Sequence, residues 1–203
     1  DVIDGDEEAT YIYKGVKATG AITDCSLIMD IGGGSTEFII ASPAQLLWKK
    51  SYNIGAARLM QAFFNSDPID EHDIQSINTH IQAQLTDLKE ACLQFQPQAL
   101  IGSAGAFETF AGMLNPEIDM KSIATAEINI SAYRQLAATL ITSTHAQRAQ
   151  MVGLIPLRVD MIVMAALLTN YVLCKTLLHL LKLKRFVRYT LKSLLSILIR
   201  SLL

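Results

Sequence analysis

Short apolar runs dominate the first quarter of the chain and predict β-strands. They cover residues 22–30, 36–41 and 46–53, separated by a glycine triplet at 32–34 and by a Ser-Pro-Ala-Gln turn at 42–45. Connections this short join antiparallel neighbours, because a parallel pair needs a long crossover. The pattern therefore predicts a sheet that starts with an antiparallel three-stranded unit.

The rest of the chain alternates helical periodicity with further short apolar runs. Apolar residues recur at three- and four-residue intervals over 5–17 and 70–95, as in helices that bury one face. Gly5 or Asp6 is expected to cap the first helix. The alternation predicts an α/β protein with a mixed sheet flanked by helices. The other expected helices are 54–64, 106–113, 132–142 with Ser131 as its cap, 145–151, 159–181 and 191–203; the other expected strands are 99–102, 128–130 and an edge strand at 184–189, with a loop at 114–127.

Length and composition fit a globular protein. The 203 residues suffice for one large domain or two small ones, and 51% of them are hydrophobic. The net charge of −2 conceals an asymmetry: residues 1–160 carry 19 acids and 10 bases, a net −9, whereas residues 161–203 carry 7 bases and no acid. The apolar run 161–174 is shorter than the roughly 20 residues of a membrane span, so a buried central helix is expected there.

The cysteines and the first residues bear on the cellular compartment. Cys25, Cys92 and Cys174 are odd in number and widely spaced, so neither a disulfide framework nor a metal cluster is expected. A reducing cytoplasm fits this pattern. The chain starts with acidic residues, without Met or a basic segment. No signal peptide is therefore expected, and the missing Met indicates a processed or cut chain.

The glycine triplet between the first two strands is the strongest chemical signal. Gly32, Gly33 and Gly34 lack side chains, so their backbone N–H groups can converge on one anion, and Ser35 adds a hydroxyl donor. Carboxylates on both sides repel a phosphate unless a divalent cation lies between them. The stretch therefore predicts a phosphate site with Mg²⁺ or Mn²⁺ held by Asp30 and Glu37.

The glycine triplet has two other interpretations. Three glycines can form a flexible hairpin loop without any chemistry, but the acids and hydroxyls around them make that interpretation less attractive. A Walker A loop is excluded, because no Lys-Ser/Thr pair follows and the next element is a strand. The four histidines lie outside this region, so no Ser-His-Asp or Cys-His arrangement competes.

The stretch 30–37, Asp-Ile-Gly-Gly-Gly-Ser-Thr-Glu, resembles the second phosphate-binding motif of the exopolyphosphatase and guanosine pentaphosphate phosphohydrolase family (Ppx/GppA). This family is part of the actin-like ATPase and sugar-kinase superfamily. The resemblance continues, in the same order along the chain, in residues 5–16, 51–59, 101–109 and 156–163.

The resemblance implies a fold and an activity. It implies a ribonuclease H-like lobe of the actin and sugar-kinase type, and hydrolysis of the terminal phosphoanhydride of polyphosphate or guanosine pentaphosphate. Glu8 lies 22 residues before Asp30, where the family has its general base, so Glu8 and Glu37 are the expected catalytic residues. Taken alone, Glu8 is better explained as an acid in the first turn of a helix, where acidic residues are common and usually structural.

Family members have two lobes, and the resemblance places residues 1–203 as one domain equivalent to the second, C-terminal lobe. The N-terminal lobe, which bears the first phosphate loop, is absent from this sequence and is an expected partner, and a homodimer is a further expectation. Relatives also have a polar loop near 186–196, so residues are expected to be missing there. Neither nucleic acid nor a membrane span is expected.

Several other residues are weaker candidates for the site. The N-terminus of the helix at 54–64 offers N–H groups to an anion, and Arg58 on it could contact phosphate, although a surface arginine is the commoner case. The resemblance equates the turn with Ser103 and Gly105 to the superfamily's adenosine-side motif and makes Glu108 a supporting residue. It also places Arg158 and Asp160 near the active site, where a helix-start ion pair is the plainer role.

Two further functions were compared with hydrolysis. A non-catalytic phosphate- or nucleotide-sensing module with the same fold is the main alternative, and the presence of both Glu8 and Glu37 favours hydrolysis over it. A sugar-kinase-like phosphotransferase is disfavoured, because no motif indicates an acceptor pocket. The sequence does not choose between polyphosphate and the guanosine nucleotide.

Overall fold

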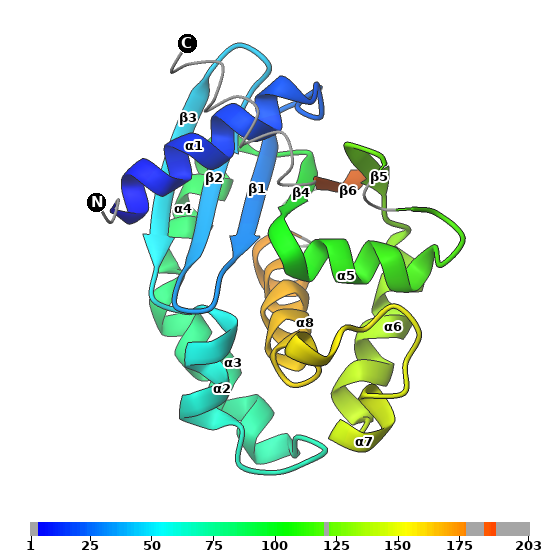
Figure 1. Cartoon of the computed structure of the whole chain (residues 1–203). Coiled ribbons are helices and arrows are strands. Elements are labelled where there is room, and N and C mark those ends of the chain that lie inside the picture. The colour runs from blue at the N-terminus through cyan, green and yellow to red at the C-terminus, as the bar shows by residue number, and fades with distance from the viewer. Residues whose placement is uncertain (1–3, 120–121, 178–184, 190–203) are drawn as a thin grey trace.

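A computed structural model of the chain describes residues 4–119, 122–177 and 185–189 (Figure 1). It is an α/β protein built on one six-stranded sheet with the order β3-β2-β1-β4-β6-β5. The strands are β1 (Ser26–Ile31), β2 (Thr36–Ala41), β3 (Leu46–Tyr52), β4 (Ala99–Ser103), β5 (Thr125–Glu127) and β6 (Arg185–Tyr189).

The sheet is mixed, as the sequence predicts. β1, β2 and β3 form the expected antiparallel unit, and the glycine triplet lies in the hairpin loop between β1 and β2. β4 runs parallel to β1 and β6 runs parallel to β4, whereas β5 is antiparallel to β6. The expectation that 184–189 is an edge strand is therefore wrong, because β5 pairs with the outer side of β6.

Helices account for most of the remaining described residues. They are α1 (Gly5–Ala18), α2 (Ala56–Phe63), α3 (Glu71–Gln84), α4 (Thr86–Phe95), α5 (Ala104–Leu114), α6 (Ile130–Thr142), α7 (His145–Arg148) and α8 (Met161–Tyr171), with a 3₁₀ turn at Pro156–Arg158 and a π-helix at Val172–Leu177.

The single helix expected at 70–95 is two helices. Leu85, between α3 and α4, has φ −97° and ψ 24°, outside the α-helical range. Its side chain is 2% exposed and lies four residues after the buried Ile81, so the buried apolar face continues across the break.

Helix α1 lies across one face of the antiparallel unit (Figure 1). Its first turn is capped by Asp4, whose side chain accepts a hydrogen bond from the Glu7 N–H at 2.7 Å, so the caps expected at Gly5 and Asp6 are wrong. Below it lies a small apolar cluster shared by the helix and the strands: Ala9, Ile12, Val16, Ala21, Ile22, Ile28, Ile39, Ala41 and Ile101.

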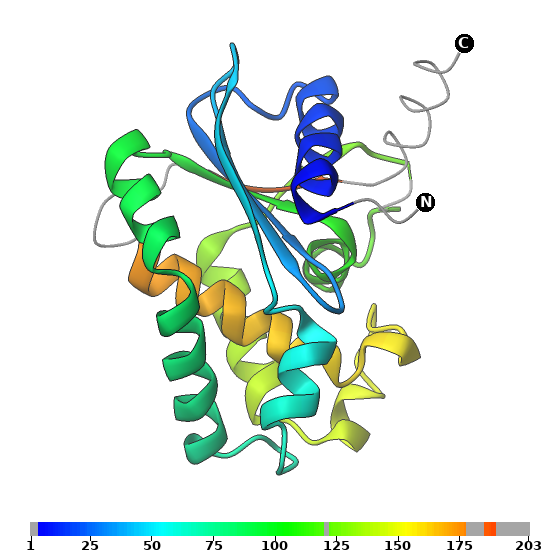
Figure 2. The ribbon, with the colours of Figure 1, turned by 90° about the vertical axis from the view of Figure 1, so that its left-hand side faces the viewer.

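The larger hydrophobic core lies against the opposite face of the sheet. The centre of this core is α8, which runs between α3 and α6 in the helical half of the molecule (Figure 2). Eight consecutive residues of α8, Ile162 to Thr169, are buried, so this helix is the expected buried central helix. None of the helices that the structure describes is long and apolar enough to cross a membrane.

Several short elements differ from the expectation. The strand expected at 128–130 lies earlier, at β5, inside the expected loop. Asn129 caps α6, since its side chain accepts from the Ala132 N–H at 3.0 Å, and Ser131 lies inside the helix. The long helix expected at 159–181 starts at Met161, and its α-helical part ends at Tyr171. The helix expected at 191–203, and most of the segment where missing residues are expected, lie outside the described residues.

Truncation of Ile12 tests the packing of α1. Ile12 is 4% exposed, so we expect Ile12→Ala to lower the free energy of unfolding by about 2–4 kcal/mol through lost burial and the cavity left behind. Urea denaturation measures this change. Val152→Ala, at a side chain that is 78% exposed, is the control and should change stability by less than about 0.5 kcal/mol. Equal effects in the two variants would contradict the described packing.

Candidate active site

A row of four polar side chains crosses the sheet at the end of β1. Asp30 on β1 lies directly opposite Glu37 on β2 and beside Ser103 on β4, and Glu37 lies opposite Ser51 on β3. Residues that are direct cross-strand partners project from the same face of a sheet. Ser103, Asp30, Glu37 and Ser51 therefore form one row on the α1 face, next to the apolar cluster.

The two acids of the row are buried, and the two serines bind them from outside. Asp30 is 7% and Glu37 is 1% exposed. The Ser103 hydroxyl donates to Asp30 Oδ2 and the Ser51 hydroxyl donates to Glu37 Oε1, each at 2.7 Å. The serines thus meet part of the hydrogen-bonding need of two carboxylates that are buried side by side.

Burial and nearby negative charges make both acids hard to ionise. The pKa of Asp30 is raised to about 7, first by removal from water and then by the negative charges of Glu37, Glu8 and Glu108, against the hydrogen bond from Ser103. The pKa of Glu37 is also raised, first by burial, against hydrogen bonds from serine hydroxyls, and then by the charge of Glu8. A cation between the two carboxylates would relieve this repulsion.

Glu8 lies near this row, where the family resemblance requires it. It is exposed, and its charge raises the pKa of both buried acids. The start of α1 is placed by Gly5, because a Cβ on Gly5 would lie only 2.6 Å from the Ser51 Cβ and Oγ. A close approach of helix and strand that only glycine permits therefore brings the first turn of α1 to the row.

The glycine loop follows the row directly and is open to solvent. Gly33 and Gly34 are exposed, so no packed side chains fill the space around them. The Gly32 N–H donates to the Ser35 carbonyl at 3.0 Å and is therefore not free to bind a phosphate. The amides of Gly33, Gly34 and Ser35 have no acceptor in the described part of the chain, so they are the donors that the loop can offer.

Helix α2 supports the loop from behind. The amides of Ala56, Arg58 and Gly55 donate to the carbonyls of Gly32, Gly33 and Gly34 at 2.8, 3.0 and 3.2 Å. The expectation that these N–H groups at the start of α2 are free for an anion is therefore wrong. The Arg58 side chain also donates, through Nε, to the Gly34 carbonyl at 3.0 Å, so it braces the loop.

A pocket of about 220 Å³ lies between the loop and the start of α5 and α8. Its walls include Gly32, Gly33, Gly105 and several apolar residues. Arg158 also lines it and packs against Gly105 so closely that a Cβ there would lie 1.9 Å from Arg158 Nη2. Arg158 Nη1 donates to Thr109 Oγ1 at 2.9 Å. The structure thus brings Gly105 and Arg158 together beside the glycine loop.

Asp160 belongs to a different cluster. Its Oδ1 lies 2.7 Å from His145 Nδ1 and 3.1 Å from Nη2 of Arg148, which is fully buried and also binds Asp67 at 3.1 Å. Burial by itself would raise the pKa of Asp160, but the hydrogen bonds from His145 and Arg148 outweigh it and lower this pKa. These contacts join α7 to the start of α8, which is a structural role.

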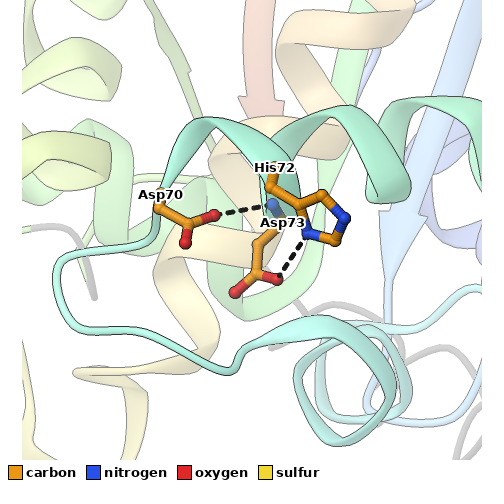
Figure 3. A group of neighbouring side chains, drawn as sticks. All are labelled: Asp70, His72 and Asp73. Carbon is orange, nitrogen blue, oxygen red and sulfur yellow. Dashed lines mark hydrogen bonds and ion pairs between the residues drawn. The ribbon is translucent and has the colours of Figure 1, made fainter.

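Asp70, His72 and Asp73 form a group in the described part of the chain whose possible ligand atoms all lie within 4.8 Å of one another (Figure 3). The cap of α3 explains the group, since Asp70 accepts from the Asp73 N–H at 2.8 Å. The Asp73 carboxylate accepts from the Asn65 backbone and side-chain amides at 2.9 and 3.0 Å. Its oxygens are therefore already occupied, and His72 is exposed to solvent.

Sequence reasoning missed several residues that shape the site. Ser51 has no signal of its own, because its role depends on the pairing of β2 with β3. Gly55 precedes a helix, which was a usable signal for close contact: a Cβ there would lie 2.5 Å from the Gly33 carbonyl. Arg148 lies in the four-residue helix α7, and its burial could not be predicted from so short an element.

Comparisons with known proteins were made against this geometry. Residues 1–183 match the Ppx/GppA phosphatase family. A guanosine-5'-triphosphate,3'-diphosphate pyrophosphatase of Pseudoalteromonas translucida is 31% identical over 68% of this chain. The crystal structure of an exopolyphosphatase from Cytophaga hutchinsonii superposes with a TM-score of 0.90 at 33% identity over 99% of this chain. That of the Aquifex aeolicus Ppx/GppA phosphatase, with a TM-score of 0.80 and 16% identity over 100% of this chain, shares the fold.

These relatives are longer than the present chain. The chain spans 29% of the Pseudoalteromonas protein, 65% of the Cytophaga protein and 65% of the Aquifex protein. The family resemblance and the fold class predicted from the sequence are both confirmed by these matches.

Substitution of Gly55 tests the contact between the loop and α2. We expect Gly55→Ala to lower the free energy of unfolding by more than about 2 kcal/mol, because the new Cβ would collide with backbone atoms of Gly33 and Gly34. Gly34→Ala is the matched control, since a Cβ there meets nothing within 4 Å. Thermal unfolding of the two variants measures the difference, and a stable Gly55→Ala protein would refute the described loop.

The raised pKa of Asp30 predicts a pH dependence of stability. The folded state holds the Asp30 proton up to about pH 7 and the unfolded state releases it near 3.8, so stability is lost as pH rises through this range. We expect Asp30→Asn, in EDTA, to raise the melting temperature by about 3 °C or more at pH 8, and by much less at pH 5.

Asp87→Asn is the control for this experiment. Hydrogen bonds from Lys50 and Tyr52 outweigh burial and lower the pKa of Asp87, so its contribution is present at neutral pH and is lost on acidification. Asp87→Asn should therefore lower the melting temperature at pH 8, and the decrease should become smaller as pH falls. Parallel curves for wild type and Asp30→Asn would contradict the assignment of a raised pKa to Asp30.

Proposed function

Because this chain belongs to the Ppx/GppA phosphatase family, we propose that it hydrolyses the terminal phosphoanhydride of inorganic polyphosphate or guanosine pentaphosphate. The observation that supports this most directly is the juxtaposition of three features. A buried acid pair, an exposed glycine loop and the exposed carboxylate of Glu8 meet at one end of the sheet. The names of the similar proteins agree with such a substrate class.

The loop binds the terminal phosphoryl group. The amides of Gly33, Gly34 and Ser35 are the donors. The Ser35 hydroxyl, which hydrogen-bonds Glu37 in this structure, adds another donor when it turns to the phosphate. Because α2 fixes the loop carbonyls, these amides are already in place before the substrate arrives. Preorganised donors stabilise the charge of a transferring phosphoryl group without reorganisation during the reaction.

Asp30 and Glu37 are the residues that would hold a divalent cation. Their oxygens are the hard ligands that Mg²⁺ and Mn²⁺ prefer, and the two buried carboxylates lie directly opposite each other across β1 and β2. When bound, the cation supplies positive charge to the phosphoryl oxygens. Ser103 and Ser51 keep the two carboxylates oriented through the hydrogen bonds described above.

Glu8 accepts the proton of the attacking water. The water oxygen forms a bond to the terminal phosphorus, the bond from phosphorus to the bridging oxygen breaks, and the shortened phosphate chain leaves with the electron pair. Glu8 is suited to this step because it is exposed at the edge of the row. A carboxylate near the buried acids but in contact with water can take up a proton that Asp30 and Glu37 cannot reach from inside the sheet.

Replacement of Glu8 tests the proposal. The protein is a chimera in which this chain is joined to the part of the Cytophaga exopolyphosphatase that it does not cover. We expect Glu8→Gln to lower kcat for phosphate release by at least about 100-fold, for polyphosphate and for guanosine pentaphosphate with Mg²⁺, because the base is lost. Release of inorganic phosphate measures the rate.

Glu7→Gln is the matched control, since Glu7 is in the same turn and its carboxylate accepts from the Tyr11 hydroxyl. It should keep kcat within about 3-fold of the parent. Unchanged release in Glu8→Gln would remove Glu8 as the base. Binding of either substrate without release by the parent chimera would instead favour a phosphate- or nucleotide-sensing module.

A further inference from the structure

The first turn of α1 carries Glu8 but has little apolar support of its own. Asp6, Glu7 and Glu8 are all exposed, and the buried face of the helix starts at Ala9. The apolar cluster therefore attaches the middle and the end of α1 to the sheet. Something else must hold the first turn against the strands, because helix ends fray when they lack tertiary contacts.

Lys49 on β3 supplies this contact. Its Nζ donates to the Asp6 carbonyl at 2.5 Å and to Thr10 Oγ1 at 3.0 Å, and it lies 3.4 Å from the Asp6 carboxylate. An ammonium group has three donors, so the two hydrogen bonds use two of them, and the ion pair with Asp6 adds a charge attraction. The Lys49 side chain is 25% exposed, which makes the contact partly shielded from water.

The same contacts rule out a simpler role for this lysine. A cation near a phosphate site is usually expected to bind the phosphate. Here the ammonium is directed at α1, and its partners are a carbonyl, a hydroxyl and a carboxylate of that helix. Lys49 therefore acts on the helix and through it on the residue that the helix presents.

β3 thereby contacts both the helix that carries Glu8 and the buried acid Glu37. Two residues beyond Lys49, Ser51 lies on the same face of the strand, donates to Glu37 and contacts Gly5 at the start of α1. The distance between Glu8 and the row consequently depends on one short segment of β3. A displacement of about 1 Å at a reacting group can lower a rate by about 100-fold.

We propose that Lys49 is a positioning residue that holds the first turn of α1 so that Glu8 reaches the water next to Glu37. This inference rests on the proposed function and adds to it a residue that touches neither substrate nor metal. Because its effect passes through Glu8, loss of Lys49 should lower kcat and leave KM nearly unchanged.

Lys17 offers a matched control at the other end of the same helix. Its Nζ donates to the Ala44 carbonyl in the β2–β3 turn at 3.1 Å and to the Tyr13 hydroxyl at 3.1 Å. Lys17→Met thus removes the same kind of tether, from the same helix to the same hairpin, far along the chain from Glu8. A merely structural role predicts similar effects for the two lysines.

The experiment compares Lys49→Met, Lys49→Arg and Lys17→Met in the chimera described above. We expect Lys49→Met to lower kcat for polyphosphate about 10-fold with KM within about 2-fold, Lys49→Arg to restore much of the rate, and Lys17→Met to change neither. On a Glu8→Gln background, Lys49→Met should change kcat by less than about 2-fold, since both act on one step.

Hydrogen exchange of the 203-residue chain gives a readout that needs no activity. The Glu8 amide donates to the Asp4 carbonyl at 2.9 Å, and Lys49→Met should speed its exchange at least about 10-fold while Lys17→Met does not. If Glu8→Gln abolishes turnover but Lys49→Met leaves kcat and this exchange unchanged, the inference fails alone. If the parent chimera binds substrate but releases no phosphate, the proposed function fails, whatever the exchange shows. If the parent is active and Glu8→Gln leaves turnover unchanged, the role of Glu8 fails, and the inference fails with it.

Discussion

The burial of two carboxylates directly opposite each other is the constraint on which the rest of the site depends. Asp30 and Glu37 are neighbours across β1 and β2, and like charges in such a pair destabilise a sheet. The structure meets this cost in part with the hydroxyls of Ser103 and Ser51. The burial and negative charge that the serines do not offset raise the pKa of both acids. A cation bound between the carboxylates would replace their repulsion with attraction. A site of this kind favours ligands that arrive with a metal ion, as phosphates do.

The glycine loop shows how the fold aims backbone groups without using side chains. Its carbonyls accept hydrogen bonds from the first turn of α2, and the close contact at Gly55 leaves no room for a Cβ. In a trans peptide the N–H and C=O groups point in opposite directions. Fixing the carbonyls toward the helix therefore turns the amides of Gly33 and Gly34 toward solvent, where a phosphate can bind. The N-terminus of α2 thus holds the loop through hydrogen bonds, and the loop amides are the groups that can bind the ligand.

Much of this arrangement could be predicted from local sequence. The antiparallel unit, the turn into α5 and the buried helix α8 follow from periodicity and from turn residues, which act over a few positions. The failures are of another kind. The break at Leu85, the strand β5 and the cap at Asn129 depend on what each residue packs against or hydrogen-bonds to in the folded chain. The resemblance places Asp160 near the site, whereas in the folded chain its carboxylate contacts His145 and a buried arginine, Arg148, that no local pattern reveals.

The sequence by itself determined the chemistry of the loop, because glycines, a serine and two acids within eight residues limit what that stretch can bind. Only the tertiary structure decided their partners. Extending the pairing of Ala41 with Leu46 along β3 would place Lys50 opposite Glu37, but a register shift after Ile40 places Ser51 there. One extra residue in a strand reverses which side chains share a face. The parallel pairing of β1 with β4 likewise brings in Ser103, and the docking of α1 brings in Glu8, because contacts between distant segments form only when the whole chain packs.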